Sequence, residues 1–137
     1  MDPTIESATD SRPKVITTAI RILTLSIAIG LLMSLVRVAQ QVSGAPLVLA
    51  ILIVLAFFGV FLFLVSRIWA GRNWARIVFL ILVLIGLPFA IPNYIAELRK
   101  NVLSGSVSML IVILQLLGTY LLFTKNSNTW FRAPKQK

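Results

Sequence analysis

The side chains that could carry chemistry in this sequence are few, and the commonest catalytic types are missing. Among 137 residues there is no histidine and no cysteine, and the acids number 4. The chain therefore lacks the usual general base, the usual metal ligand and any thiolate. Apart from Glu97, the acids lie in the N-terminal tail, so no paired carboxylates are available, and serines and threonines have no accompanying base. We expect no enzymatic activity, no cofactor and no metal site.

Gln115 is the one amide or acid deep inside a long apolar run. At helical spacing, Ser108, Gln115 and Thr119 lie near one face. An amide surrounded by hydrocarbon needs hydrogen-bond partners, so we expect this face to point into a helix bundle. Thr24 and Ser26 are candidate partners. A structural bond between helices is the simpler interpretation, and contact with a substrate is the alternative.

Three small residues, Ser26, Gly30 and Ser34, are spaced by four in the first apolar run. This spacing allows two helix backbones to approach closely within a membrane. We expect the three residues to pack inside one bundle, and a dimer face is the alternative interpretation.

A basic turn lies at the middle of the chain, from Arg67 to Arg76, between long uncharged runs. Its arginines and tryptophans are of the types that bind lipid phosphates and prefer the membrane interface. Ordinary topological anchoring is the simpler interpretation, and an anionic-lipid site is the alternative. The candidate lipid contacts are Arg21, Arg67, Arg72, Arg76, Trp69 and Trp74.

Glu97 lies close in sequence to two basic residues, Arg99 and Lys100. We expect a solvated local ion pair there, and a recognition contact for a periplasmic partner is the alternative.

The elements that position these residues belong in a membrane. Hydrophobic residues make up 58% of the chain and charged residues 12%, against about 25% charged in soluble domains. The net charge is +9, but the basic residues lie at the ends of apolar runs. Such a pattern favours anionic lipid head groups over nucleic acid as the partner.

The apolar runs predict an all-α membrane bundle of four helices, arranged up-down-up-down. We expect a polar cytoplasmic tail over 1–14, a transmembrane domain over 15–124 and a basic cytoplasmic tail over 125–137. A cleaved signal peptide is the alternative for the first run, disfavoured by its acidic leader. Because proline breaks or bends helices, Pro88 and Pro92 predict a kink and then a helix end. The expected helices are 15–37, 47–67, 76–92 and 105–124, with an interfacial segment over 93–101.

Four spans place both termini on one side of the membrane, and the positive-inside rule selects the side. Only Arg37, Arg99 and Lys100 fall on the side opposite the termini, whereas the other lysines and arginines share the side of the termini. We therefore predict that both termini and the basic turn are cytoplasmic in a bacterial plasma membrane.

The two halves of the chain look alike. Arg21-Ile22 and Arg76-Ile77 open the first and third helices, and Gly59 and Gly118 lie at matching depths. These matches suggest a duplicated helical hairpin with its pseudo-two-fold axis along the membrane normal.

Two short motifs carry a resemblance. Asn73-Trp74-Ala75-Arg76 opens the third helix, and Leu121-Leu122-Phe123-Thr124 is followed by Trp130-Phe131. With these motifs the chain resembles small uncharacterised inner-membrane proteins of bacteria. The resemblance implies four spans in the plasma membrane, and it implies no activity and no site residues.

Two functions are compatible with these features. The first is a non-enzymatic membrane protein that binds a partner, as an accessory, regulatory or immunity-type protein. The second is a small transporter or channel, working as a homodimer, for an apolar or lipid-like solute. A transporter predicts an open polar cavity that reaches Gln115, and a partner-binding protein predicts a filled bundle.

Overall fold

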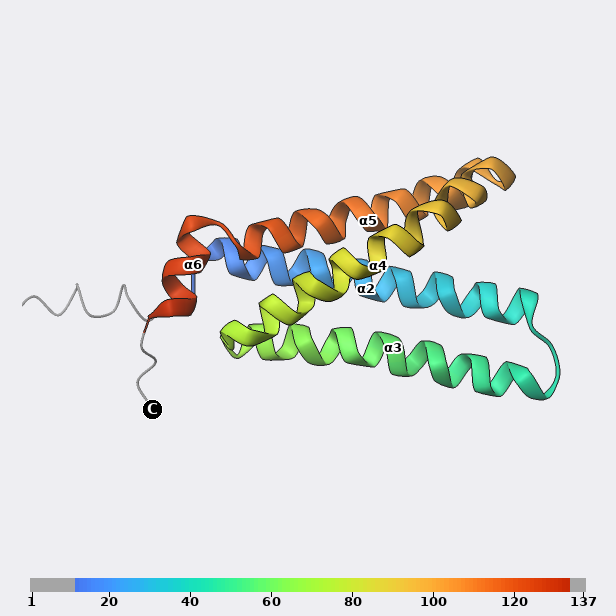
Figure 1. Cartoon of the computed structure of the whole chain (residues 1–137), viewed down its shortest axis with the longest axis horizontal. Helices are drawn as coiled ribbons and strands as arrows, with labels where there is room; N and C mark the ends of the chain where they lie inside the picture. The colour runs from blue at the N-terminus through green and yellow to red at the C-terminus, as the bar shows by residue number, and fades with distance from the viewer. Residues whose placement is uncertain (1–11, 134–137) are drawn as a thin grey trace, which may run out of the picture.

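The computed structural model describes residues 12–133, and this part of the chain is all-α (Figure 1). Four long helices run up-down-up-down and pack as a bundle, which confirms the predicted fold class. A short fifth helix folds against one end of it. The helices are α2 (Lys14–Gln41), α3 (Ala45–Trp69), α4 (Asn73–Lys100), α5 (Val102–Leu122) and α6 (Lys125–Arg132).

The four long helices are long and apolar enough to cross a bilayer. The shortest, α5, has 21 residues, and a span needs about 20. Their outward faces carry large apolar side chains, such as Phe89, which is 74% exposed, and Leu103, which is 76% exposed. Because water penalises such surfaces and lipid does not, the chain is a multi-pass membrane protein.

The helix boundaries differ most from the expected ones in the second half of the chain. We expected a helix end near Pro92 and a separate segment over 93–101, but α4 is helical through both prolines to Lys100. Each proline removes one helical hydrogen bond, whereas leaving the helix inside a membrane exposes several backbone groups. The tail over 125–137 also contains a helix, α6, which we did not expect.

Two tight turns join α4 to its neighbours, one from α3 and one to α5. Gly71 has a φ of 72° after α3, and Arg72 N donates to Arg67 O at 3.0 Å, which closes the helix end. At the other end of the bundle, Asn101 caps α5 by accepting from the backbone N–H groups of Leu103 and Ser104. The α4–α5 turn is therefore tight, and a Cβ at Gly105 would overlap the backbone of Leu98.

The buried core lies at the end of the bundle where α6 folds back, which we call the α6 end. Phe61 of α3 packs its ring edge against Phe79 of α4, with the centroids 5.4 Å apart. Beyond this contact α3 and α4 diverge, so that α4 joins α5 while α3 stays beside α2 (Figure 1). The fully buried large core residues are Ile16, Leu23, Ile68, Phe79 and Leu122.

The two hairpins do not pack equivalently. Gly118 of α5 lies against α2, where a Cβ would come within 2.7 Å of the Leu23 side chain. Gly59, its counterpart in the first hairpin, is exposed and has open space around it. Positions that match in the two halves of the sequence thus have different surroundings in the structure. The duplication of a helical hairpin stays a prediction.

Candidate functional site

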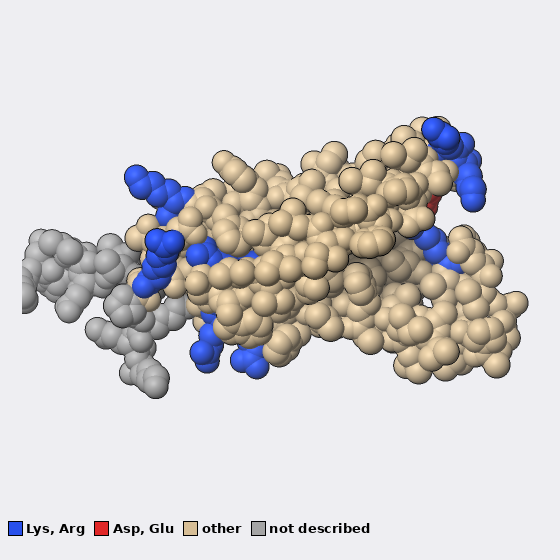
Figure 2. Space-filling model, in the orientation of Figure 1, with Lys and Arg blue, Asp and Glu red and all other residues tan. Residues whose placement is uncertain are grey.

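A cavity of about 410 Å³ lies between the four long helices, on the side of the Phe61–Phe79 contact away from α6. Its wall is mainly aliphatic and aromatic, with Phe57 and Phe58 on one side and Leu82 and Val83 on another. The molecular surface is recessed there between the two pairs of helices (Figure 2). The volume lies within the usual range of ligand pockets, about 300–1,000 Å³.

The three small residues of α2 face this cavity. Ser26, Gly30 and Ser34 all line it, and a Cβ on Gly30 would come within 3.2 Å of the Phe58 ring. The face therefore lies inside the bundle, where the simpler interpretation placed it.

The Gln115 face also points inward, and Gln115 and Ser108 line the cavity. Thr119 is buried and donates to the backbone carbonyl of Gln115 at 2.7 Å. The expected partners of the amide were wrong, because Ser26 donates to Leu23 O within its own helix and Thr24 is exposed. Within residues 12–133 the Gln115 side chain has no hydrogen-bond partner, so its amide is open to the cavity.

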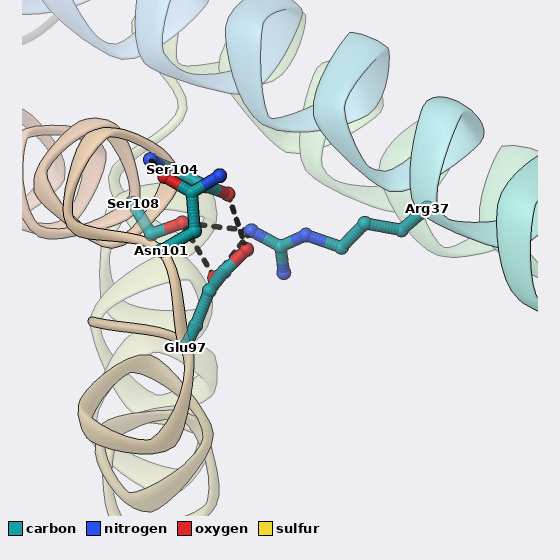
Figure 3. Close-up of polar contacts among 5 residues, drawn as sticks. All are labelled: Arg37, Glu97, Asn101, Ser104 and Ser108. Atoms are coloured by element: carbon teal, nitrogen blue, oxygen red, sulfur yellow. Dashed lines mark hydrogen bonds and ion pairs between the residues drawn. The ribbon is translucent and has the colours of Figure 1, made fainter. Parts of the chain in front are cut away.

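A polar cluster, shown in Figure 3, lies at the end of the cavity opposite α6, where Arg37 and Ser108 belong to the wall. Arg37 of α2 reaches across to Glu97 of α4, with Nη2 at 2.6 Å from Oε2. The same nitrogen donates to Ser108 Oγ at 2.7 Å, and this hydroxyl donates to Glu97 Oε2 at 2.9 Å. Ser104 donates to the other carboxylate oxygen at 2.6 Å. The ion pair joins α2 to α4, and the two serines join both helices to α5.

This cluster corrects the expectation for Glu97. We expected it to pair with Arg99 or Lys100, its sequence neighbours, but its carboxylate turns inward to Arg37, 60 residues away. Arg99 and Lys100 are exposed. On a helix, residues two apart point in different directions, so Arg99 could not share the inward face of Glu97.

The cavity meets only one member of the ion pair. Arg37 belongs to the cavity wall and Glu97 does not. The Nε and Nη1 groups of Arg37 have no hydrogen-bond partner in the described part of the chain, because its hydrogen bonds all use Nη2. The cavity is therefore apolar along most of its wall and carries unused guanidinium donors at one end.

Arg76, at the α6 end, is buried with 4% exposure. Its Nε donates to Asn73 Oδ1 at 2.7 Å, and its Nη1 donates to Leu122 O at 3.0 Å and Asn128 Oδ1 at 2.7 Å. The guanidinium also lies 4.5 Å from the ring centroid of Phe131. Of the candidate lipid contacts, Arg76 is the one that the structure places away from the surface.

The other candidate lipid contacts gather at the α6 end, where most lysines and arginines lie (Figure 2). Trp69 also lies under the guanidinium of Arg12, 3.9 Å from its ring centroid, and accepts a hydrogen bond on its carbonyl at 2.8 Å. The exposed members of the group are Arg21, Arg67, Arg72, Trp69 and Trp74.

The residues missed by sequence reasoning are Arg37, Ser104 and Tyr94, and Glu97 was assigned the wrong partner; Tyr94 lines the cavity. A signal existed, because Tyr94 and Glu97 follow Gly86 and Ala90 at helical spacing along α4. No three acids, histidines or cysteines among residues 12–133 gather as a metal site. The arrangement is suited to binding, because it combines an apolar cavity with a few convergent polar groups.

No protein-family model, no curated protein and no solved structure matches this chain.

Proposed function

We propose that this chain is a non-enzymatic integral protein of the bacterial plasma membrane that acts by binding, and that it binds an apolar or lipid-like molecule. The observation that supports this proposal is the cavity of about 410 Å³. A protein that only held a partner on its outer face would have no use for a space inside the bundle, because filling such a space stabilises a fold.

The composition of the cavity wall supports the same class of ligand. Most of its residues are aliphatic or aromatic, and its polar groups are grouped around Arg37 and Gln115. An unpaired amide within the membrane destabilises the protein unless water or a ligand forms hydrogen bonds with it. Gln115 therefore favours a molecule with some polar character over a pure hydrocarbon.

Transport of the same molecule is the second candidate function. The cavity extends from Arg37, near the end of α2, to Gln115, past the middle of α5. A binding site at this depth is typical of transporters that alternate between two openings. Net movement of the ligand between the two faces of a vesicle would distinguish transport from binding alone.

The proposed orientation places both termini and α6 in the cytoplasm. The ends of the described chain lie together at the α6 end (Figure 1), and most lysines and arginines lie there as well. The absence of cysteine permits a clean test with Ser43→Cys, between α2 and α3, and Asn126→Cys in α6. A maleimide that cannot cross membranes should label position 43 in intact cells and position 126 only after lysis; the reverse pattern would invert the orientation.

The binding function can be tested with two matched glycine variants. A Cβ at Gly86 or at Gly59 meets no atom within 4 Å, but only Gly86 lines the cavity. Gly86→Leu should therefore fill the cavity, and Gly59→Leu should add the same side chain outside it. We expect lipid extracted from the purified wild type and Gly59→Leu to contain a molecule that is depleted in Gly86→Leu. Equal lipid content in all three proteins would contradict the proposal.

A further inference from the structure

We propose that the ligand of the cavity is an anionic amphiphile with one acyl chain, whose head group binds Arg37 and whose chain enters sideways between α3 and α4. This inference rests on the proposed binding function and names the class of molecule that the cavity takes. It depends on four features, namely the charge, the depth, the volume and the opening of the cavity.

Among the residues of the cavity wall, Arg37 is the one that carries a charge. Arg37 lines the cavity and its acidic partner Glu97 does not. Two serine hydroxyls and Arg37 Nη2 hold the Glu97 carboxylate in place. Because Nη2 makes these bonds, the Nε and Nη1 groups stay available as separate charged donors, and each can donate to an oxygen of a carboxylate or phosphate. Glu97 is thus a positioning residue that holds Arg37 across the end of the cavity.

The depth of Arg37 matches the depth of a lipid head group. Arg37 lies four residues before Gln41, the end of α2, which corresponds to about 6 Å along the helix axis. From there the cavity continues toward Gln115, two turns of α5 beyond Ser108. A molecule bound with its anionic group at Arg37 would point its chain toward the middle of the membrane, as the surrounding lipids do.

The volume favours one chain over two. At about 410 Å³ the cavity lies near the lower end of the range for drug-sized ligands, which begins at about 300 Å³. A phospholipid with two acyl chains is much larger than a drug-sized molecule.

The opening of the cavity faces lipid. Phe57 and Val60 of α3, with Ile85 of α4, line the cavity and are still 58%, 51% and 58% exposed. They lie midway along their helices, where α3 and α4 diverge beyond the Phe61–Phe79 contact. None of these residues is charged, so an acyl chain can pass between α3 and α4 without leaving an apolar environment.

The test uses the full chain in nanodiscs of neutral phosphatidylcholine and two photoreactive probes that differ only in the head group. One is a long-chain fatty acid with a diazirine in its chain, and the other is the corresponding fatty alcohol. We expect the acid to label cavity residues at a concentration about tenfold or more below that of the alcohol, because only the acid forms charge-assisted hydrogen bonds with Arg37. Gly86→Leu should lose labelling by both probes, and Gly59→Leu should retain both.

Three variants assign this preference to the polar cluster. Arg37→Gln should label with the acid and the alcohol equally. Because this variant leaves Glu97 without its cation, Arg37→Gln/Glu97→Gln provides a neutral pair with the same expected loss of preference. Glu97→Gln retains the guanidinium without its counterion and should increase labelling by the acid.

The outcomes separate this inference from the proposed function. If both probes label cavity residues equally in the wild type, or if the neutral pair keeps the preference for the acid, the anionic head group is wrong and lipid binding stands. If labelling of the cavity is absent, or is unchanged in Gly86→Leu, the binding function is wrong and the inference falls with it.

Discussion

The two ends of the bundle each contain an arginine that joins distant helices, and they use it differently. Arg76, at the α6 end, is 4% exposed, and its guanidinium donates to neutral oxygens and packs on aromatic rings. Arg37, at the other end, is half-buried, pairs with a carboxylate and borders a cavity. The first arginine completes a core, and the second leaves donors unused. The two arginines therefore differ in whether space adjoins them, and only Arg37 is part of the ligand site that we propose.

Of the substitutions that test this comparison, Arg76→Ala should have the largest effect on the free energy of unfolding. The substitution leaves Leu122 O and the Asn128 side chain without their donor inside a packed core. Because hydrogen bonds to charged groups contribute more than neutral ones, we expect a loss of about 3 kcal/mol in the free energy of unfolding. Unfolding in mixed micelles with increasing SDS, followed by circular dichroism, measures it. Arg37→Ala is the control, and an equal or larger loss there would remove the distinction between the two arginines.

A smaller effect should follow from Gly118→Ala at the α6 end. The new methyl group would come within 2.7 Å of Leu23, which is fully buried and has little room to move. We expect a destabilisation of about 1–3 kcal/mol from overpacking. Gly59→Ala, at the matching position of the first hairpin, should stabilise the protein by up to about 1 kcal/mol, because alanine favours helix. Equal effects at both positions, measured by the same unfolding assay, would mean that the hairpins pack alike.

Asn128→Ala tests how much α6 contributes to the closed end. Its Oδ1 accepts from Arg76 and its Nδ2 donates to Phe123 O at 2.9 Å. Since other acceptors of Arg76 remain, we expect a loss of about 1–2 kcal/mol, less than for Arg76→Ala. Hydrogen exchange of the α6 amides should rise in the same variant. Unchanged exchange would show that the Asn128 side chain does not hold α6 against the bundle.

The smallest effect on stability should come from Gln115→Leu. The amide has no hydrogen-bond partner within residues 12–133, so its loss costs about 0.5 kcal/mol or less. The substitution should nevertheless reduce transport if the chain moves its ligand past this position, as assayed in proteoliposomes with the diazirine fatty acid. A large loss of stability would indicate that Gln115 supports the bundle rather than its ligand.

The fold class could be predicted from the sequence because the features that specify it are local. Long uncharged runs specify spanning helices without knowledge of their neighbours. Helix ends were predicted less well, since the rule that proline ends a helix describes a chain in water, and α4 continues through Pro92. The inward faces of Ser26 and Gln115 were also predictable, because small and polar residues avoid lipid.

The polar cluster was not predictable in the same way. Arg37 and Glu97 are 60 residues apart and meet only through the crossing of α2 and α4. A charged residue near a helix end has an ordinary explanation, so we interpreted Arg37 by its side of the membrane and Glu97 as a member of a local ion pair. Arg76 was misplaced for the same reason, because one of its acceptors, Asn128, belongs to a tail that we did not expect to be helical.

The hydrogen bonds from Arg76 to α5 and α6 have a consequence for the order in which the protein assembles. Ribosomes extend a chain from its N-terminus, so Arg76 is synthesised 52 residues before Asn128. During that interval the guanidinium lacks its acceptors on α5 and α6, and the α6 end can close around it only after Asn128 has been synthesised. Assembly of the helices should accordingly follow translation rather than accompany it.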